Sequence, residues 1–479
     1  MKIKLEADYA VIGSGAAGGI IFHELKNHNL NCVLIEKGNW YNFKTFRKDF
    51  LHSAKNLWAN AGYQFAEGSS LIPILQGTCV GGSTVINGAI MQKIELNYIK
   101  KIKSIFNNNI FQIEEVMKAQ NELIKLFKIR SNTDKSIENS ILNSVCENLG
   151  WKALSQLRSA PNCMFSEHCL NGCPNNAKLT IENLILKKNF ENILSNTTVN
   201  NLVINNKNVN FIECESNNEK FLVKAKKVIL SAGVIGSPKI LLKSKIKNKY
   251  IGKNFQCHLS TSITADLGAE KNKIDILPMG YQIQSNIKEL GTFFSQSIPL
   301  ELLLSKIPLY FNKLLELSSK VNHLSSWVTS TKSISKGVVD LDFWGNAKIK
   351  FSPKSEDMKK ILFSNSEVSK FLFKLGAKKI YLPLNNIPIC ETLNDLKNVS
   401  QTKLIAKNFL ISSSHLFGTC SPSIEREKGV IDENFKVKNI DNLYVIDASS
   451  LPVPTSYNPQ LTIMIIAKLA IDNIIKNYS

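Results

Sequence analysis

The sequence predicts an α/β protein in which a doubly wound, Rossmann-like parallel sheet is joined to an α+β domain with an antiparallel sheet. The first observation is the glycine pattern Gly13-x-Gly15-x-x-Gly18, which follows an apolar run and opens a helical pattern. The second is a change of texture near residue 258, after which helical and strand-like segments alternate irregularly to about residue 410. A chain of 479 residues is long enough for two such domains.

The N-terminal segment has the order of a dinucleotide-binding unit. A strand and glycine turn span residues 8–18, a helix is expected from about Ala16 to Asn27, and a strand from Asn31 to Ile35. In such a turn, the three glycines permit a tight bend, close approach of the backbone to a pyrophosphate, and close packing of the helix. The helix N-terminus at Ala16 and Ala17 offers unpaired N–H groups to an anion.

Glu36 strengthens this interpretation. It follows the second strand, 23 residues after Gly13, where a carboxylate accepts hydrogen bonds from ribose hydroxyls. The same carboxylate would repel an additional 2′-phosphate, so the pattern favours FAD or NAD over NADP. The alternative is a glycine turn of another α/β protein with a glutamate on its surface.

The rest of the chain shows these elements in order. Residues 40–75 have no regular period, helices are expected over 113–128 and 134–149, and short strands over 194–228. Within 258–410 we expect a helix from Leu300 to Leu317, strands from Gly337 to Phe351, and a helix from Glu356 to Leu375 that ends before Gly376. The expected division is therefore a cofactor domain over 1–257 with an inserted segment at about 97–190, a substrate domain over 258–410, and a return to the first domain over 411–479.

Composition excludes some classes of protein. The formal charge is +20, but only four of the 59 basic residues are arginines, the side chain that favours bidentate phosphate and guanine recognition. We therefore expect a solvated lysine surface and no nucleic-acid partner; a docking face for acidic partners or lipids is the alternative. Neither a secretory signal nor a run of about 18 apolar residues is present, which favours a cytoplasmic protein, with peripheral membrane association as the alternative. The ten cysteines are too few for a disulfide scaffold, so reduced thiols are expected.

Two motifs near the C-terminus carry the most information about chemistry. His415 lies in Ser414-His-Leu-Phe-Gly-Thr-Cys420, and Asn458 follows 43 residues later in Asn458-Pro-Gln-Leu-Thr-Ile-Met464. This arrangement resembles the C-terminal end of the glucose-methanol-choline (GMC) flavoprotein oxidoreductases. The resemblance implies that His415 is the catalytic histidine and that Asn458 faces it across the substrate.

Further motifs match the same family in the same order. The loop from Gly77 to Gly88 resembles the first GMC signature, and the segment from Ser231 to Pro238 resembles the second. The resemblance implies an FAD-binding domain and places the following additional residues at the cofactor: Gly82, Ser83, Asn87, Gly88, Val199, Ala232, Gly233, Asp447, Ala448, Asn458 and Pro459. No histidine lies between His52 and His168, so the covalent attachment through a histidine near Gly82 that some family members have is not expected; FAD should be dissociable.

The expected reaction is oxidation of an alcohol. His415 would take the hydroxyl proton while a hydride passes from the carbinol carbon to flavin N5, and Asn458 would hold the same oxygen as negative charge builds on it. The helix that begins near Gln460 would direct backbone N–H groups toward the pyrimidine end of the flavin. The alternative is that His415 is a satisfied core histidine and Asn458 a turn residue before Pro459.

A cysteine-rich loop, Cys163-x5-Cys169-x3-Cys173-Pro174, leaves several interpretations open. It resembles the loop of gluconate- and glucose-dehydrogenase large subunits, which hold an iron–sulfur cluster on thiolates. Those relatives have an adjacent cysteine pair, and here the second place is Met164. We therefore expect a structural loop without metal, with a cluster on Cys163, Cys169 and Cys173, a zinc site or a disulfide as alternatives.

The sequence thus predicts an FAD-dependent alcohol or polyol dehydrogenase or oxidase. The substrate is either a sugar acid or polyol, as the cysteine loop suggests, or an apolar alcohol, as the Leu300–Leu317 segment suggests. Oxygen, a quinone or a cytochrome is the electron acceptor. The alternatives are a GMC-fold lyase or photodecarboxylase, a gluconate-dehydrogenase-like subunit passing electrons through a cluster, and a flavin-binding subunit without chemistry of its own.

Overall fold

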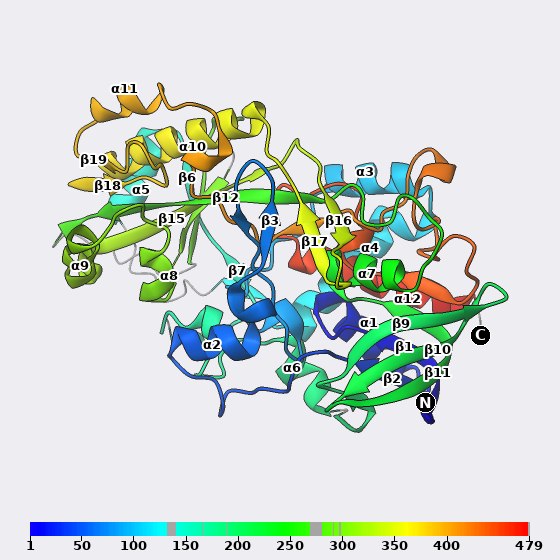
Figure 1. Cartoon of the computed structure of the whole chain (residues 1–479). Coiled ribbons are helices and arrows are strands. Elements are labelled where there is room, and N and C mark those ends of the chain that lie inside the picture. The colour runs from blue at the N-terminus through cyan, green and yellow to red at the C-terminus, as the bar shows by residue number, and fades with distance from the viewer. Residues whose placement is uncertain are drawn as a thin grey trace.

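The computed structural model describes residues 1–131, 140–164, 166–188, 190–268, 280–290, 292–296 and 298–477. Two sheets occupy opposite ends of the molecule, and both termini lie at the end that holds β1 and α12 (Figure 1). The long strand β12 (Gln256–Asp266) extends from the centre into the second sheet. The expected mixture of a parallel and an antiparallel sheet is confirmed.

The first sheet contains the predicted parallel core. Its strand order is β8-β2-β1-β11-β10-β9. Strand β21 also pairs with β11, on the side of β11 that pairs with β10. All pairs from β8 to β11 and the β11–β21 pair are parallel, whereas β9, β10 and the first half of β11 form an antiparallel meander. The strand bounds are β1 Ile3–Ile12, β2 Cys32–Ile35, β8 Ile193–Leu194, β9 Thr198–Asn205, β10 Asn208–Ser216, β11 Glu219–Leu230 and β21 Leu443–Val445.

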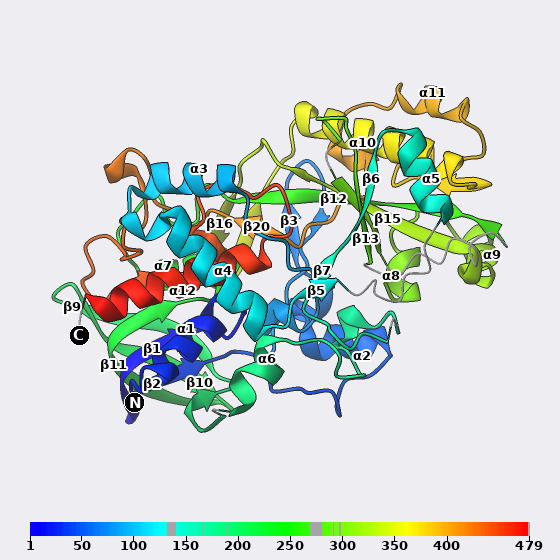
Figure 2. The same ribbon diagram turned by 180° about the vertical axis from the view of Figure 1, so that it is seen from behind.

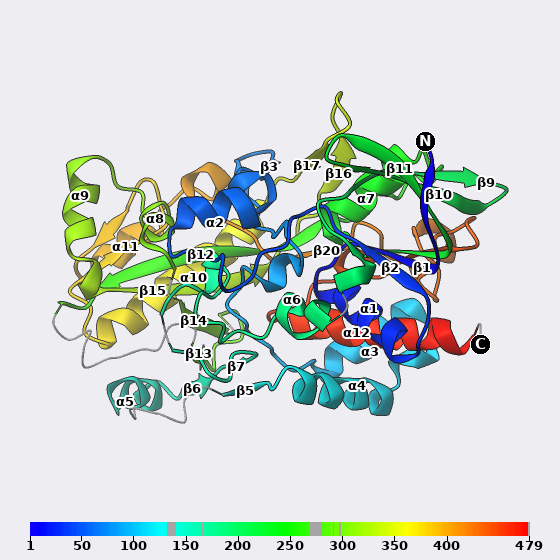
Figure 3. The same ribbon diagram turned by 90° about the horizontal axis from the view of Figure 1, so that it is seen from below.

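Helices cover this sheet with residues far apart in the sequence. The first helix, α1 (Ala16–Asn27), packs against the C-terminal α12 (Gln460–Lys476), which in turn packs against α4 (Ile113–Leu126), as the view from below shows (Figure 3). From behind, α3 (Leu96–Phe106) lies beside α4 (Figure 2). α7 (Gly233–Lys243) follows β11 and packs against β9.

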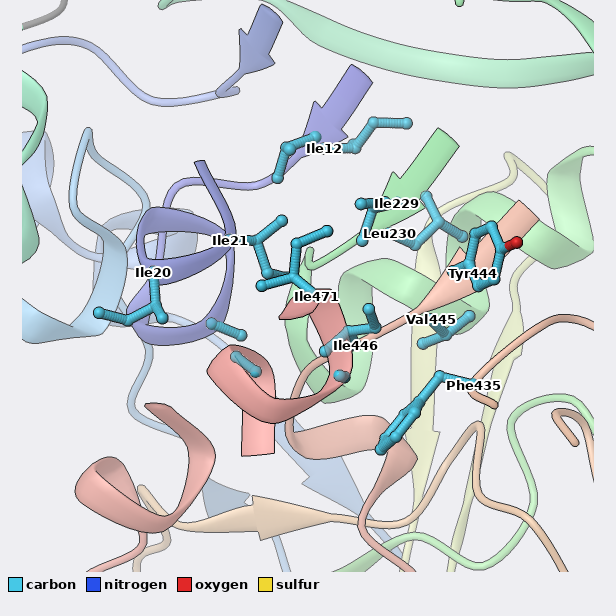
Figure 4. Close-up of a cluster of buried hydrophobic side chains, with 14 of the residues drawn as sticks. Ile12, Ile20, Ile21, Ile229, Leu230, Phe435, Tyr444, Val445, Ile446 and Ile471 are labelled. Atoms are coloured by element: carbon cyan, nitrogen blue, oxygen red, sulfur yellow. The ribbon is translucent and has the colours of Figure 1, made fainter. Parts of the chain in front are cut away.

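The core between the sheet and these helices is mainly aliphatic, with aromatic side chains such as Phe435 and Tyr444 among its members (Figure 4). Strands β1, β11 and β21 contribute Ile12, Ile229 and Val445, and helices α1 and α12 contribute Ile21 and Ile471, all of which are buried. Full burial of such a side chain stabilises the fold by about 1.5–3 kcal/mol. The same packing fixes the strand ends from which the site is built.

The second sheet is antiparallel throughout. Its order is β19-β18-β12-β15-β14-β13-β6, and β20 pairs with the beginning of β12. Its strands other than β12 are β6 Lys152–Ser155, β13 Tyr281–Gln284, β14 Thr292–Gln296, β15 Leu324–Lys332, β18 Lys379–Tyr381, β19 Ile389–Cys390 and β20 Leu416–Phe417. Strand β6 comes from the segment expected as an insertion, so the inserted segment and the substrate sheet are joined by main-chain hydrogen bonds. The domain boundaries themselves remain a prediction.

The helix α10 (Ser355–Lys374) confirms the helical expectation for residues 356–375, and Gly376 follows it with a φ of +96°. It packs on β12 and β15. The single helix expected from Leu300 to Leu317 is wrong. The chain forms α8 (Leu300–Leu304) and α9 (Asn312–Ser319), because Pro308 between them lacks the backbone N–H that a continuous helix requires.

Two other regions differ from expectation. The strands expected between 337 and 351 exist as β16 (Val338–Leu341) and β17 (Ala347–Lys350), but they form a separate sheet with β3 (Phe65–Glu67) and β4 (Ile72–Pro73). Residues 40–75, which lack a sequence period, nevertheless contain α2 (Phe50–Leu57) and these two short strands. Strand pairing with a distant segment stabilises elements too short to produce a periodic pattern.

The remaining elements are short. They are β5 Arg130–Ser131, β7 Leu157–Arg158, α5 Ser140–Asn148, α6 Ile181–Leu184 and α11 Asp395–Val399. The helix expected over 134–149 is observed as α5, and its expected first residues lie outside the described residues. Over the parts of the chain that the structure describes, no helix is both long and apolar enough to cross a bilayer. A cytoplasmic location remains a prediction.

Candidate cofactor and active site

A cavity of about 670 Å³ lies where the two glycine loops meet the C-terminal segment. Three helix N-termini reach it, since residues at or before the first turns of α1, α7 and α12 line its wall. Orphan N–H groups at such termini attract negative charge. Most predicted site residues line the cavity: Gly13, Gly15, Ala16, Ala17, Glu36, Gly82, Ser83, Val199, Ala232, Gly233, His415, Asp447, Ala448 and Pro459.

The first glycine loop meets the steric requirements of a dinucleotide cradle. Gly13 has a φ of +100°, and a Cβ there would lie 2.4 Å from the carbonyl oxygen of Ser231. A Cβ at Gly18 would lie 1.8 Å from the carbonyl oxygen of Gly13, so this position requires glycine for helix packing and does not line the cavity. A Cβ at Gly15 would meet nothing within 4 Å. Gly15 thus leaves open space where a pyrophosphate would approach the backbone.

The carboxylate of Glu36 is hydrogen-bonded to the first glycine loop. One carboxylate oxygen accepts from the backbone N and the Oγ of Ser14, at 2.9 and 2.7 Å, and the other accepts from the backbone N of Gly38 at 2.8 Å. The side chain is buried, and burial raises the pKa of Glu36 despite these hydrogen bonds. Three of roughly four acceptor positions are used within the protein, which leaves capacity on the cavity side for a ribose hydroxyl.

The second glycine loop packs directly onto the first. The backbone N of Gly81 donates to Ser14 Oγ at 2.9 Å, and a Cβ at Gly82 would lie 2.9 Å from the Cα of Gly15. Asn87 and Gly88 do not line the cavity: the Asn87 side chain bonds to that of Gln460, and the Gly88 carbonyl accepts from Arg158 Nε at 3.1 Å. These two residues hold the loop against α12 and the cysteine loop.

The carboxylate of Asp447 accepts three hydrogen bonds at the wall of the cavity that includes the N-terminus of α7. It accepts from the backbone N of Gly233 at 2.8 Å, from Ser237 Oγ at 2.5 Å and from the backbone N of Ser449 at 2.7 Å. Burial raises the pKa of Asp447, and the hydrogen bonds oppose this shift. The carboxylate therefore fixes the N-terminus of α7 against the turn after β21.

His415 lines the cavity and has a polar partner at each ring nitrogen. Its Nδ1 lies 3.0 Å from His258 Nδ1, and its Nε2 lies 3.4 Å from Asn458 Nδ2. Burial, and to a smaller extent His258, lowers the pKa of His415 to about 3. The imidazole is therefore neutral at physiological pH, which is the form able to accept a proton.

Asn458 is held by its main chain. Its backbone N donates to Gln92 Oε1 at 2.9 Å, and the following Pro459 is the N-cap of α12. Asn458 does not line the large cavity, but its amide group contacts the ring that does. The structure thus brings His415 and Asn458 together from segments 43 residues apart.

Two buried basic side chains, Arg158 and Lys178, flank the cysteine loop and contact it. Arg158, 1% exposed, directs its two terminal nitrogens to the Sγ atoms of Cys163 and Cys169, at 3.6 and 3.4 Å. Lys178, 2% exposed, donates to the carbonyl oxygens of Cys169 and Asn87, at 2.8 and 2.9 Å. No group of three or more His, Cys, Asp or Glu side chains that could hold a metal ion is found among the described residues. The loop is thereby tied to Asn87 and Gly88 beside the cavity.

The family follows from a comparison with protein-family models. Two models, both described as GMC oxidoreductase, match residues 11–260 and 334–467, so that the N-terminal match alone covers more than half of the chain. This chain belongs to the GMC oxidoreductase family. The predicted family is therefore confirmed, and the chain is an oxidoreductase.

Relatives of this GMC oxidoreductase span nearly its whole length. An uncharacterised GMC-type oxidoreductase of Sinorhizobium fredii is 24% identical over 97% of this chain and 94% of its own. A long-chain-alcohol oxidase of Arabidopsis thaliana is 23% identical over 96% of this chain and 67% of its own. Among solved structures, pyridoxine 4-oxidase from Mesorbium loti has a TM-score of 0.72 at 15% identity, covering 98% of this chain and 99% of its own. Formate oxidase has a TM-score of 0.73 at 13% identity, covering 100% and 99%. These two structures share the GMC flavoenzyme fold.

Sequence reasoning missed two residues of this site. The sequence patterns assign no role to His258, although it contacts the predicted catalytic histidine. Gln92, which follows the second glycine loop, holds Asn458 through its side chain. A signal existed for His258, because it is one of only seven histidines in the chain. Gln92 lies in a segment with no motif that distinguishes it.

Proposed function

We propose that this protein is an FAD-dependent oxidase or dehydrogenase of alcohols in which His415 is the general base. The observation that carries the proposal is the position of His415: a neutral imidazole at the wall of a dinucleotide-sized cavity, with Asn458 at its Nε2. The glycine turn with open space at Gly15, the acceptor capacity of Glu36 and the three helix N-termini suit the ribose and pyrophosphate of FAD.

FAD in this cavity would supply the acceptor for the hydride that leaves the carbinol carbon. The chain supplies the proton chemistry: His415 Nε2 accepts the proton of the substrate hydroxyl, and the Asn458 amide donates to the same oxygen as its negative charge grows. The neighbouring side chains of Leu416, Phe417 and Tyr457 are buried, which limits the access of bulk water to His415 and Asn458. Exclusion of water strengthens both polar interactions.

Support for the substrate class comes from four relatives. The similarity to four long-chain-alcohol oxidases of Arabidopsis thaliana favours an apolar alcohol over a sugar acid or polyol. The test is anaerobic mixing of the FAD-loaded protein with long-chain alcohols, sterols, polyols and sugar acids while the flavin absorbance is recorded. Bleaching by at least one alcohol is expected, and readmission of air or addition of a quinone then identifies the acceptor. A flavin that no alcohol bleaches would contradict the proposal and favour a lyase or photoenzyme.

The FAD is proposed to be dissociable, since no histidine lies near the Gly77–Gly88 loop: the histidines of this part of the chain are His52 and His168. Acid precipitation of the holoenzyme should therefore release all yellow colour into the supernatant. Colour that remains with the washed precipitate would show a covalent bond and contradict this part of the proposal.

A further inference from the structure

The partner of His415 is positioned by strand pairing. Strands β12 and β20 pair antiparallel through Gln256 with Phe417 and Cys257 with Leu416, which places His258 opposite His415. The backbone N of His258 donates to the backbone oxygen of His415 at 3.0 Å. The two side chains are also in contact. Their Nδ1 atoms lie 3.0 Å apart, and the planes of the two rings make an angle of 87°. The His258 ring is 3% exposed and therefore has no alternative partner in bulk water.

The positions of the hydrogens on the two imidazole rings follow from the contact between His258 and Thr455. His258 Nε2 lies 2.9 Å from the backbone carbonyl oxygen of Thr455, which can only accept, so His258 Nε2 carries a hydrogen. Burial lowers the pKa of His258 to about 4, so the ring is neutral at pH 7 and its Nδ1 is a bare acceptor. The contact between the two Nδ1 atoms needs one hydrogen, which must lie on His415 Nδ1. His415 Nε2 is then unprotonated.

The charged surroundings support this assignment. Among the described residues, Lys332 is the charged group that acts on His258, and its positive charge disfavours protonation of the His258 ring. Its Nζ donates to Ser456 Oγ at 2.9 Å. His415 has His258 as its only electrostatic neighbour of note in the described chain. A carboxylate that would stabilise a charged His258 is absent from these neighbours, unlike the aspartate of a catalytic triad.

We propose that His258 is a positioning residue that fixes the tautomer of His415, holding the proton on Nδ1 and leaving the Nε2 lone pair free for the substrate hydroxyl. The inference rests on the proposed role of His415 as base. Once His415 Nε2 has taken the substrate proton, His258 Nδ1 continues to accept from His415 Nδ1 and stabilises the imidazolium. No proton moves beyond His415, because His258 Nε2 already donates to Thr455.

Two substitutions test separately the hydrogen-bond acceptor of His258 and the volume of its ring. His258→Asn retains an acceptor close to the position of Nδ1, whereas His258→Leu fills similar space without one. We expect the leucine variant to slow anaerobic flavin reduction by alcohol about 100-fold, and the asparagine variant to remain within about fivefold of the wild type. The FAD affinity should be unchanged in both. The exposed His323 provides the control, since His323→Leu should reduce at the wild-type rate.

The tautomer can be observed without turnover. In protein labelled with 15N-histidine, the His415 signals are those that disappear in His415→Ala. At pH 7 we expect a pyrrole-type Nδ1 and a pyridine-type Nε2 for His415, and loss of this single pattern in His258→Leu. A His415 that is protonated on Nε2 in the wild type would overturn the inference, even where the leucine variant fails to fold.

The positioning role of His258 and the role of His415 as base can be refuted separately. Normal reduction in His258→Leu together with slow reduction in His415→Ala would refute the positioning role and keep the base. Normal reduction in His415→Ala would remove the base, and the proposed function with it. Slow reduction in both the leucine and the asparagine variants would show that the ring as a whole, and not its acceptor, is required, which also contradicts the inference.

Discussion

At the scale of single residues, each functional side chain depends on a partner that a linear motif does not contain. His415 and His258 are 157 residues apart in the chain, and their contact arises only when β20 pairs with β12. Glu36 was predicted from its spacing, but its hydrogen bonds to Ser14 and Gly38 show that it also shapes the glycine loop. Motifs predict the residue types of the candidate site, whereas the partners that set their orientation and protonation are visible only in the tertiary structure.

Asn458 gives a test of transition-state stabilisation. Its amide lies 3.4 Å from His415 Nε2, so it can donate to the substrate oxygen once the substrate is bound. Asn458→Ala should slow flavin reduction about 100-fold with little change in substrate affinity. Stopped-flow absorbance at several alcohol concentrations separates the two quantities. The control is Asn398→Ala on exposed α11, and a wild-type reduction rate in Asn458→Ala would remove the residue from the mechanism.

At the scale of elements, the strand–turn–helix unit was predictable and several longer-range elements were not. β1, α1 and β2 lie within a few residues of their expected positions, because glycine turn chemistry and apolar periodicity are local signals. The segment from Leu300 to Leu317 has an apolar composition typical of a helix, yet Pro308 divides it. The β16–β17 hairpin joins β3 and β4, and pairing between such distant segments leaves no local signal.

Two glycines of the first loop should respond differently to the same methyl group. Gly18→Ala places a Cβ 1.8 Å from the Gly13 carbonyl oxygen, so α1 must shift, at a cost of about 1–3 kcal/mol. Gly15→Ala meets no atom within 4 Å and has an extended backbone, so the fold should tolerate it while the methyl group enters the cavity. Thermal unfolding of the apoprotein and FAD titration measure the two effects.

We expect Gly18→Ala to lower the melting temperature and Gly15→Ala to leave it unchanged while weakening FAD binding at least about tenfold. The pair serves as its own control, since both changes add one methyl group to the same loop. An equal fall of the melting temperature in both variants, or full FAD affinity in Gly15→Ala, would contradict the cradle described above.

At the scale of the whole molecule, burial of His258 links acid to stability. The folded pKa of His258 is about 4, below the ordinary value of 6.5, so the unfolded chain binds a proton between these values that the folded chain does not. Stability should therefore fall as the pH falls from about 6.5 to 4, by up to about 1.4 kcal/mol per pH unit for this group. The raised pKa values of buried Glu36 and Asp447 act in the opposite direction, so the total slope is a balance.

Comparison of variants isolates the histidine contribution. His258→Asn removes the titrating group, so its melting temperature should fall less than that of the wild type over the same pH range. His323→Asn, on the surface, should follow the wild type. Urea unfolding at each pH gives the same comparison as free energies. Identical pH dependence in His258→Asn and the wild type would show that His258 is not held neutral by burial.

The proposed function depends most on His415 as the base of an FAD-dependent alcohol oxidation. The most direct measurement is the rate of anaerobic flavin reduction by an alcohol, compared between the wild type and His415→Ala, both loaded with FAD. We expect unchanged FAD binding and a reduction rate lower by about 100- to 10,000-fold in the variant. Reduction of the variant at the wild-type rate would contradict this role of His415.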